Sequence, residues 1–87
     1  IFLDDTPQRI AELDLSLKSG DVTRFIRAAH SIKGSSANMG ASLLRGVAER
    51  LEHHAKEHGL ADVGAMLSEL RAEWANAELA IRELIKT

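Results

Sequence analysis

The sequence predicts an all-α fold: an antiparallel four-helix bundle with a short additional N-terminal helix. Aliphatic residues recur at steps of three and four, whereas the alternating β-branched runs typical of strands are absent. Aromatic residues make up only 3% of the 87 residues, which suits an aliphatic core between packed helices. At this length we expect one domain that spans residues 1–87.

The first segment predicts two helices. Residues 2–5 resemble the last turn of a short helix whose start we expect before residue 1. Thr6 and Pro7 then fit an N-cap followed by proline at the first helical position, which predicts a second helix over about residues 7–18. The buried face of this second helix is expected to hold Ile10, Leu13 and Leu17.

Two helices of similar length follow, each ended by a glycine. Gly20 closes the preceding helix and Asp21 caps a helix over about residues 22–39, and Gly40 stops it. The next helix runs over about residues 41–58. The expected buried faces are Val22, Phe25, Ala29, Ile32, Ser36 and Met39 in the first helix, and Leu44, Val47, Ala48, Leu51 and Ala55 in the second.

The last helix has the most regular pattern, because its apolar residues alternate steps of four and three. This spacing is typical of a long helix in a left-handed antiparallel bundle. Trp74 lies within the pattern and is interpreted as a core residue. The predicted face contains Val63, Leu67, Leu70, Trp74, Ala77, Ile81 and Leu84.

Composition excludes several classes of function. The net charge is −2, with 11 basic and 13 acidic residues, so no basic face for nucleic acid is expected. No apolar run approaches the roughly 20 residues that cross a bilayer, and we expect no direct membrane contact. The absence of cysteine excludes disulfides and fits a reducing compartment. We therefore expect a cytoplasmic domain, monomeric in isolation. Because the sequence opens with Ile1, we expect it to belong to a larger protein, for which an inner-membrane anchor is an open alternative.

His30 carries the most informative chemistry. At about 100° per residue it lies roughly 140° from the apolar direction of its helix, which predicts exposure to solvent. Its neighbours are Ile26 and Arg27 one turn before, and Lys33 and Gly34 one turn after. A neutral imidazole is a competent nucleophile, and Lys33 can place a positive charge beside phosphoryl oxygens. Gly34 costs about 1 kcal/mol relative to alanine, which indicates a place where another molecule approaches the backbone.

A plainer interpretation applies to the same residues. Most exposed histidines on helices are ordinary surface residues. Gly34 and the adjacent serines, Ser35 and Ser36, fit a close crossing of two helices equally well, or a weak position that the helix tolerates. Periodicity alone therefore predicts an accessible histidine and not a phosphorylated one.

The run Ala-His-x-x-Lys-Gly-Ser-Ser-x-x-x-Gly-Ala over residues 29–41 resembles the signature of the histidine-containing phosphotransfer (HPt) family. The similarity extends upstream to residues 2–7 and 19–21, and downstream into the pattern of the next helix. The resemblance implies that His30 is the phosphoacceptor, that Lys33 stabilises the phosphoryl charge and that Gly34 gives a partner access.

The resemblance also implies the partners and the mechanism. A receiver domain with a phospho-aspartate docks around His30, whose Nε2 attacks phosphorus, and the group later passes to a second receiver. We expect Leu15, outside the apolar face of its helix, to be exposed and to form the docking surface together with Ile26, Arg27 and Ala37. No acidic cluster is expected around His30, so Mg²⁺ would come from the receiver. The domain itself is expected to need no cofactor and to be a carrier, not an enzyme.

Two alternatives stay open beside this interpretation. A histidine-kinase dimerisation domain also presents a phosphorylatable histidine, but that family places an acidic residue directly after it and a proline soon afterwards. Here Ser31 follows His30, and Pro7 is the only proline. A helical adaptor without phosphate chemistry is the second alternative, and it leaves Lys33 and Gly34 beside His30 as a coincidence.

A second histidine cluster, His53, His54 and His58, carries less information. His54 and His58 are spaced to share a metal ion, but two ligands are too few for a site. We expect a solvated helix end and no metal.

Overall fold

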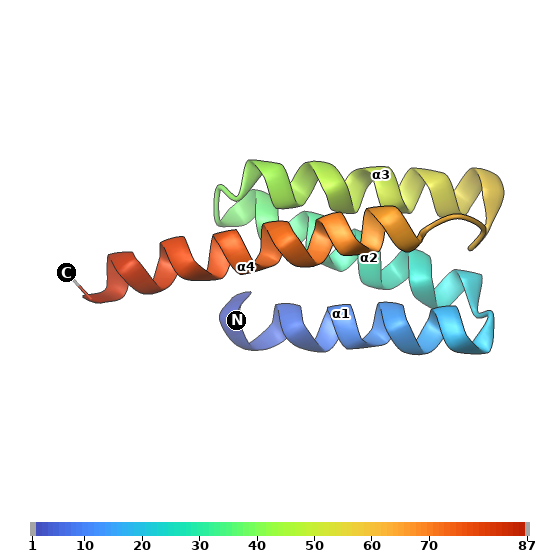
Figure 1. The fold of residues 1–87 in the computed structure, drawn as a ribbon, viewed down its shortest axis with the longest axis horizontal. Helices are drawn as coiled ribbons and strands as arrows, with labels where there is room; N and C mark the ends of the chain where they lie inside the picture. The colour runs from blue at the N-terminus through green and yellow to red at the C-terminus, as the bar shows by residue number, and fades with distance from the viewer. Residues whose placement is uncertain (1, 87) are drawn as a thin grey trace.

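The structure is a computed structural model that describes residues 2–86, with the side chains of residues 4–84. It contains four helices: α1 (Phe2–Ser19), α2 (Val22–Asn38), α3 (Ser42–His58) and α4 (Gly64–Lys86). Consecutive helices run in opposite directions and form an elongated bundle (Figure 1). The predicted all-helical class is confirmed.

The prediction of a separate short helix at the N-terminus was wrong. Pro7 lies inside α1, which continues through Thr6 without a break. Pro7 is in the second turn, so its missing N–H removes one backbone hydrogen bond, to the carbonyl of residue 3. Thr6 is almost completely buried and does not act as the expected cap. The packing and remaining hydrogen bonds of α1 outweigh the loss of one hydrogen bond. The two predicted helices therefore form a single helix.

The turns between the helices follow the sequence prediction closely. Gly20 and Gly40 have φ angles of 75° and 71°, in the left-handed region that glycine adopts without strain. Asp21 caps α2, since its carboxylate accepts a hydrogen bond from the backbone N–H of Arg24 at 3.1 Å. These turns return the chain sharply and set α2 against both α1 and α3.

The core is aliphatic, as predicted, apart from Phe25, which is completely buried. Most of the expected core positions are buried, but Leu17, Met39 and Leu84 are exposed by 36%, 49% and 75%, and these three assignments were wrong. The buried hydrophobic residues are Ile10, Leu13, Phe25, Ala28, Ala29, Ile32, Leu44, Val47, Ala48, Leu51, Ala55, Val63, Leu67 and Leu70.

The exposure of Leu84 follows from the length of α4. The C-terminal part of α4 projects beyond the ends of the other three helices (Figure 1). Trp74 and Ile81 are only partly buried, and a shallow apolar hollow lies between this part of α4 and the α2–α3 turn around Leu43. Steps of four and three predict which face of a helix is apolar, but not how far its neighbours extend along it.

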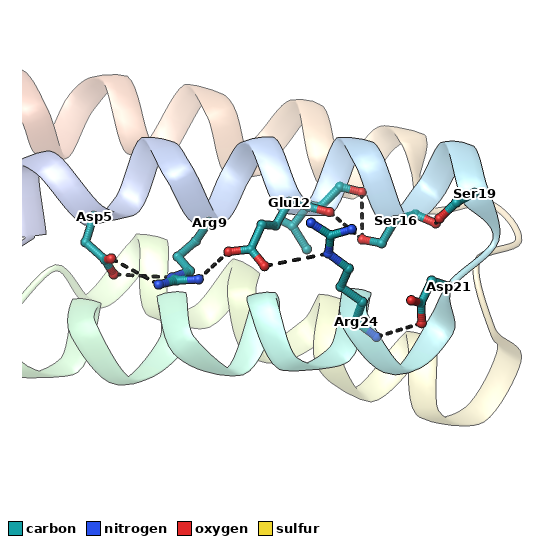
Figure 2. Close-up of polar contacts among 8 residues, drawn as sticks. Asp5, Arg9, Glu12, Ser16, Ser19, Asp21 and Arg24 are labelled. Carbon is teal, nitrogen blue, oxygen red and sulfur yellow. Dashed lines mark hydrogen bonds and ion pairs between the residues drawn. The ribbon is translucent and has the colours of Figure 1, made fainter.

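Polar contacts join α1 to α2 on the outside of the bundle (Figure 2). Arg9 lies between Asp5 and Glu12 on α1, and the second carboxylate oxygen of Glu12 faces Arg24 of α2 at 3.8 Å. These side chains are partly exposed, so each pair contributes little stability. Their alternating charges nevertheless favour this pairing of α1 with α2.

Candidate functional site

His30 stands on the outer face of α2, in the middle of the helix. Its side chain is 65% exposed. Phe25, Ala29 and Ile32 are completely buried and fix the rotation of α2 about its axis. The side chain of His30, which lies on the opposite side of the helix, therefore points outward. The predicted exposure of the imidazole is confirmed.

The imidazole nonetheless has a buried partner on the adjacent helix. Nδ1 of His30 lies 3.0 Å from Oε2 of Glu52 on α3, 22 residues further along the chain. The side chain of Glu52 is only 5% exposed. It occupies a position on the inward face of α3, four residues after Ala48 and three before Ala55, both of which are buried.

Two lysines complete the cluster. The ammonium of Lys33, one turn after His30, lies 2.7 Å from Oε1 of Glu52, and that of Lys56, one turn after Glu52, lies 3.1 Å from Oε2. Oε1 has no hydrogen-bond partner of regular geometry, so the Lys33 contact is an ion pair. One buried carboxylate therefore holds three nitrogen-bearing side chains from two helices. We call these four residues, His30, Lys33, Glu52 and Lys56, the Glu52 cluster.

Charge in the Glu52 cluster keeps the carboxylate ionised. Burial acts to raise the pKa of Glu52, but contacts with Lys33, Lys56 and His30 outweigh it and lower the pKa to about 2. Glu52 is thus an anion at neutral pH and can only accept hydrogen bonds. When the ring of His30 is neutral, its proton must lie on Nδ1 to make the contact with Glu52, and Nε2 then carries a free lone pair.

Gly34 follows His30 by one turn of α2 and lies on an open surface. It is exposed, and a Cβ atom added to it would meet nothing within 4 Å. The close helix crossing that was considered for Gly34 is therefore absent. Packing therefore does not account for a glycine at this position of the helix.

The expected docking residues differ in how exposed they are. Leu15 is 53% exposed, as predicted. Arg27 and Ala37 are exposed, whereas Ile26 is partly buried against the core. Three of the four expected docking residues are therefore accessible, and they include apolar and positively charged side chains.

Glu52 and Lys56 are the site residues that sequence reasoning missed. No acidic cluster was expected around His30, and the structure places a single carboxylate there, that of Glu52. The sequence did not indicate this contact, because it depends on how α2 and α3 are rotated against each other. The sequence did contain a signal for Glu52, because this residue lies among Ala48, Leu51 and Ala55 on the predicted buried face of its helix. An unpaired charge is costly in such a place, so a positively charged partner could have been expected.

The second histidine cluster has different contacts. Nε2 of His54 lies 2.6 Å from the carbonyl oxygen of Ala61, and its ring packs near that of His58. Within residues 4–84 no three potential ligands converge on a metal site. No helix in the described part of the chain is long and apolar enough to cross a membrane.

The fold and the site define a small helical module that presents one histidine to solvent over a buried carboxylate. The family model for the Hpt domain matches residues 1–80. The chain therefore belongs to the Hpt domain family, whose members carry phosphoryl groups on histidine in two-component systems and work with the receiver domains of response regulators. Searches of curated proteins and of solved structures gave no match.

Proposed function

We propose that this domain is a phosphorelay intermediate, in which His30 takes a phosphoryl group from the phospho-aspartate of one receiver domain and passes it to the aspartate of another. The observation that supports the proposal best is the exposed imidazole whose Nδ1 faces an ionised, buried carboxylate. This arrangement directs the free lone pair of Nε2 toward solvent, where a partner can bring its phosphoryl group.

The transfer step requires little from this chain beyond positioning and charge. Nε2 attacks phosphorus in line, and the bond between phosphorus and the aspartate oxygen breaks. Lys33 and Lys56 supply positive charge beside the reacting group, since each keeps its ammonium within one helical turn of the histidine or its partner. Mg²⁺ would come with the receiver, because Glu52 is already paired with cations.

The docking surface in this proposal consists of Leu15, Ile26, Arg27 and Ala37. Leu15 and Ile26 offer apolar area, and Arg27 adds a positive charge that suits the acidic groups of a magnesium-binding partner. Gly34 leaves the approach to Nε2 free of side-chain atoms. We place the domain in the cytoplasm and expect it to be a monomer in isolation.

A phosphotransfer assay tests the proposal. A receiver domain is phosphorylated with acetyl phosphate that carries a ³²P label and is then mixed with this chain. The stability of the label that appears on the chain is measured in acid and in base. We expect label that is acid-labile and base-stable, that is absent from His30→Gln, and that remains in His54→Gln as the matched control. Label retained in His30→Gln would exclude His30 as the acceptor, and label acquired from ATP alone would favour the kinase alternative.

A further inference from the structure

We propose that Glu52 has a second role after transfer: it keeps Nδ1 of the phosphorylated His30 protonated, so that the phosphoryl group stays easy to pass on. This inference rests on the proposed function. It starts from the position of the carboxylate, whose Oε2 lies 3.0 Å from Nδ1 and leaves Nε2 free. Glu52 acts through the imidazole and does not touch the phosphoryl group, so it is a positioning residue.

The proton balance of the cycle leads to this role. The neutral ring enters with one proton, on Nδ1. When Nε2 bonds to phosphorus and the donor oxygen leaves, the ring becomes positively charged and keeps that proton. Only Nδ1 can then bear a proton, and an ionised carboxylate can form a hydrogen bond only with the protonated form. Glu52 therefore favours the protonated ring over the neutral phosphorylated ring.

Protonation decides how well the ring leaves. When the bond between phosphorus and nitrogen breaks in the protonated ring, its electron pair returns to Nε2 and a neutral imidazole departs. The same step in the unprotonated ring would release an imidazolate anion, which is a far poorer leaving group. Phosphorus becomes bonded to the acceptor oxygen, and the ring returns to its starting tautomer. No proton has to enter or leave the ring between the two transfers.

The two lysines of the Glu52 cluster also favour the protonated ring after transfer. In the described part of the chain, the titratable groups in contact with Glu52 are His30 and Lys33 on α2 and Lys56 on α3. Before transfer the two ammonium groups offset the carboxylate. A phosphoryl group adds negative charge that pairs with these ammonium groups, so the carboxylate is left to stabilise the proton on Nδ1.

An NMR titration of the phosphorylated chain tests the inference. The chain is phosphorylated with phosphoramidate, a small donor that needs no receiver, and the ¹⁵N shift of Nδ1 of His30 is followed against pH. In Glu52→Gln we expect the pH at which Nδ1 loses its proton to fall by about one unit or more. At a pH above both of these values, Glu52→Gln should lose its phosphoryl group to water about tenfold more slowly than the wild type. The reason is that the protonated fraction of the ring falls about tenfold for each unit by which its pKa is lowered.

Glu49→Gln is the matched control. Glu49 lies on the same helix, one turn before Glu52, but its carboxylate pairs with Arg45 at 3.7 Å. We expect this variant to titrate and to lose its phosphoryl group as the wild type does. A folded Glu52→Gln variant with the wild-type titration would overturn the inference.

A comparison within the wild type covers the case in which Glu52→Gln does not fold. The phosphorylated wild type is titrated in buffer and in concentrated urea, where the contact with Glu52 is lost. We expect Nδ1 to hold its proton to higher pH in the folded chain, and equal titrations would contradict the inference. Failure of His30 to accept label from a receiver would instead contradict the proposed function.

Discussion

Lys56 follows Glu52 by one turn of α3, and its ammonium lies 3.1 Å from the same carboxylate oxygen that faces His30. The Lys33 ammonium contacts the other oxygen from α2. The side chains of Lys33 and Lys56 are 27% and 56% exposed, and we expect both to turn toward a phosphoryl group on Nε2. The carboxylate of Glu52 thus keeps two ammonium groups close to the imidazole of His30, where they can pair with a phosphoryl group.

Removing either cation should slow transfer. We expect Lys33→Gln and Lys56→Gln each to lower the rate of transfer from a phosphorylated receiver by about tenfold, since a lost charge-assisted contact costs about 1.4 kcal/mol. Stopped-flow or quenched-flow kinetics measure the rate. Lys18→Gln, at the exposed end of α1, is the control and should react as the wild type does. An unchanged rate in both Lys33→Gln and Lys56→Gln would show that their charges are not used.

Bulk at Gly34 should separate stability from function. Gly34→Gln meets no neighbouring atom, so we expect the free energy of unfolding to rise by about 0.5 kcal/mol while transfer slows. Gly46→Gln is the matched control, because Gly46 lies inside α3 and an added Cβ there also meets nothing. It should gain similar stability and keep its transfer rate. Equal transfer rates in the two variants would contradict the access role of Gly34.

Leu15 should affect docking and not the chemistry of the histidine. We expect Leu15→Ser to raise the receiver concentration needed for half-maximal transfer by about fivefold, or about 1 kcal/mol. Phosphorylation by phosphoramidate should not change. Leu79→Ser is a suitable control, since Leu79 is 61% exposed on α4. If both variants dock equally well, the receiver binds elsewhere.

Acid should remove the contribution of Glu52 to stability. Its pKa is lowered from 4.5 to about 2 in the folded chain, so this contribution is fully present above about pH 4.5 and is lost as the pH falls toward 2. In Glu52→Gln the contribution is absent at every pH. The difference in unfolding free energy between wild type and variant, from urea titrations, should therefore shrink over this range. A constant difference would mean that Glu52 is not held as an anion by its partners.

The helices could be predicted from the sequence because their determinants are local. Gly20 and Asp21 act through their own backbone and side chain, and the apolar period of α2 sets which way His30 points. Pro7 misled the prediction because proline usually marks the first turn of a helix, whereas here it lies inside α1 at the cost of one backbone hydrogen bond.

The rest depends on how the helices meet. The contact between His30 and Glu52 needs a particular rotation and vertical offset of α2 against α3, and no pattern within one helix contains it. Leu84 was expected in the core because the apolar period continues to it, although the other helices end before it. Side-chain types and spacing could therefore indicate the nucleophile, but not the carboxylate that positions it.

The most direct test of the account is to locate the phosphoryl group at the level of the atom. The ¹⁵N-labelled chain is phosphorylated by a phosphorylated receiver, and coupling between ¹⁵N and ³¹P is measured by NMR. We predict that phosphorus is bonded to Nε2 of His30, with Nδ1 carrying the proton that faces Glu52. Phosphorus on Nδ1 of His30, or on His53, His54 or His58, would contradict the account.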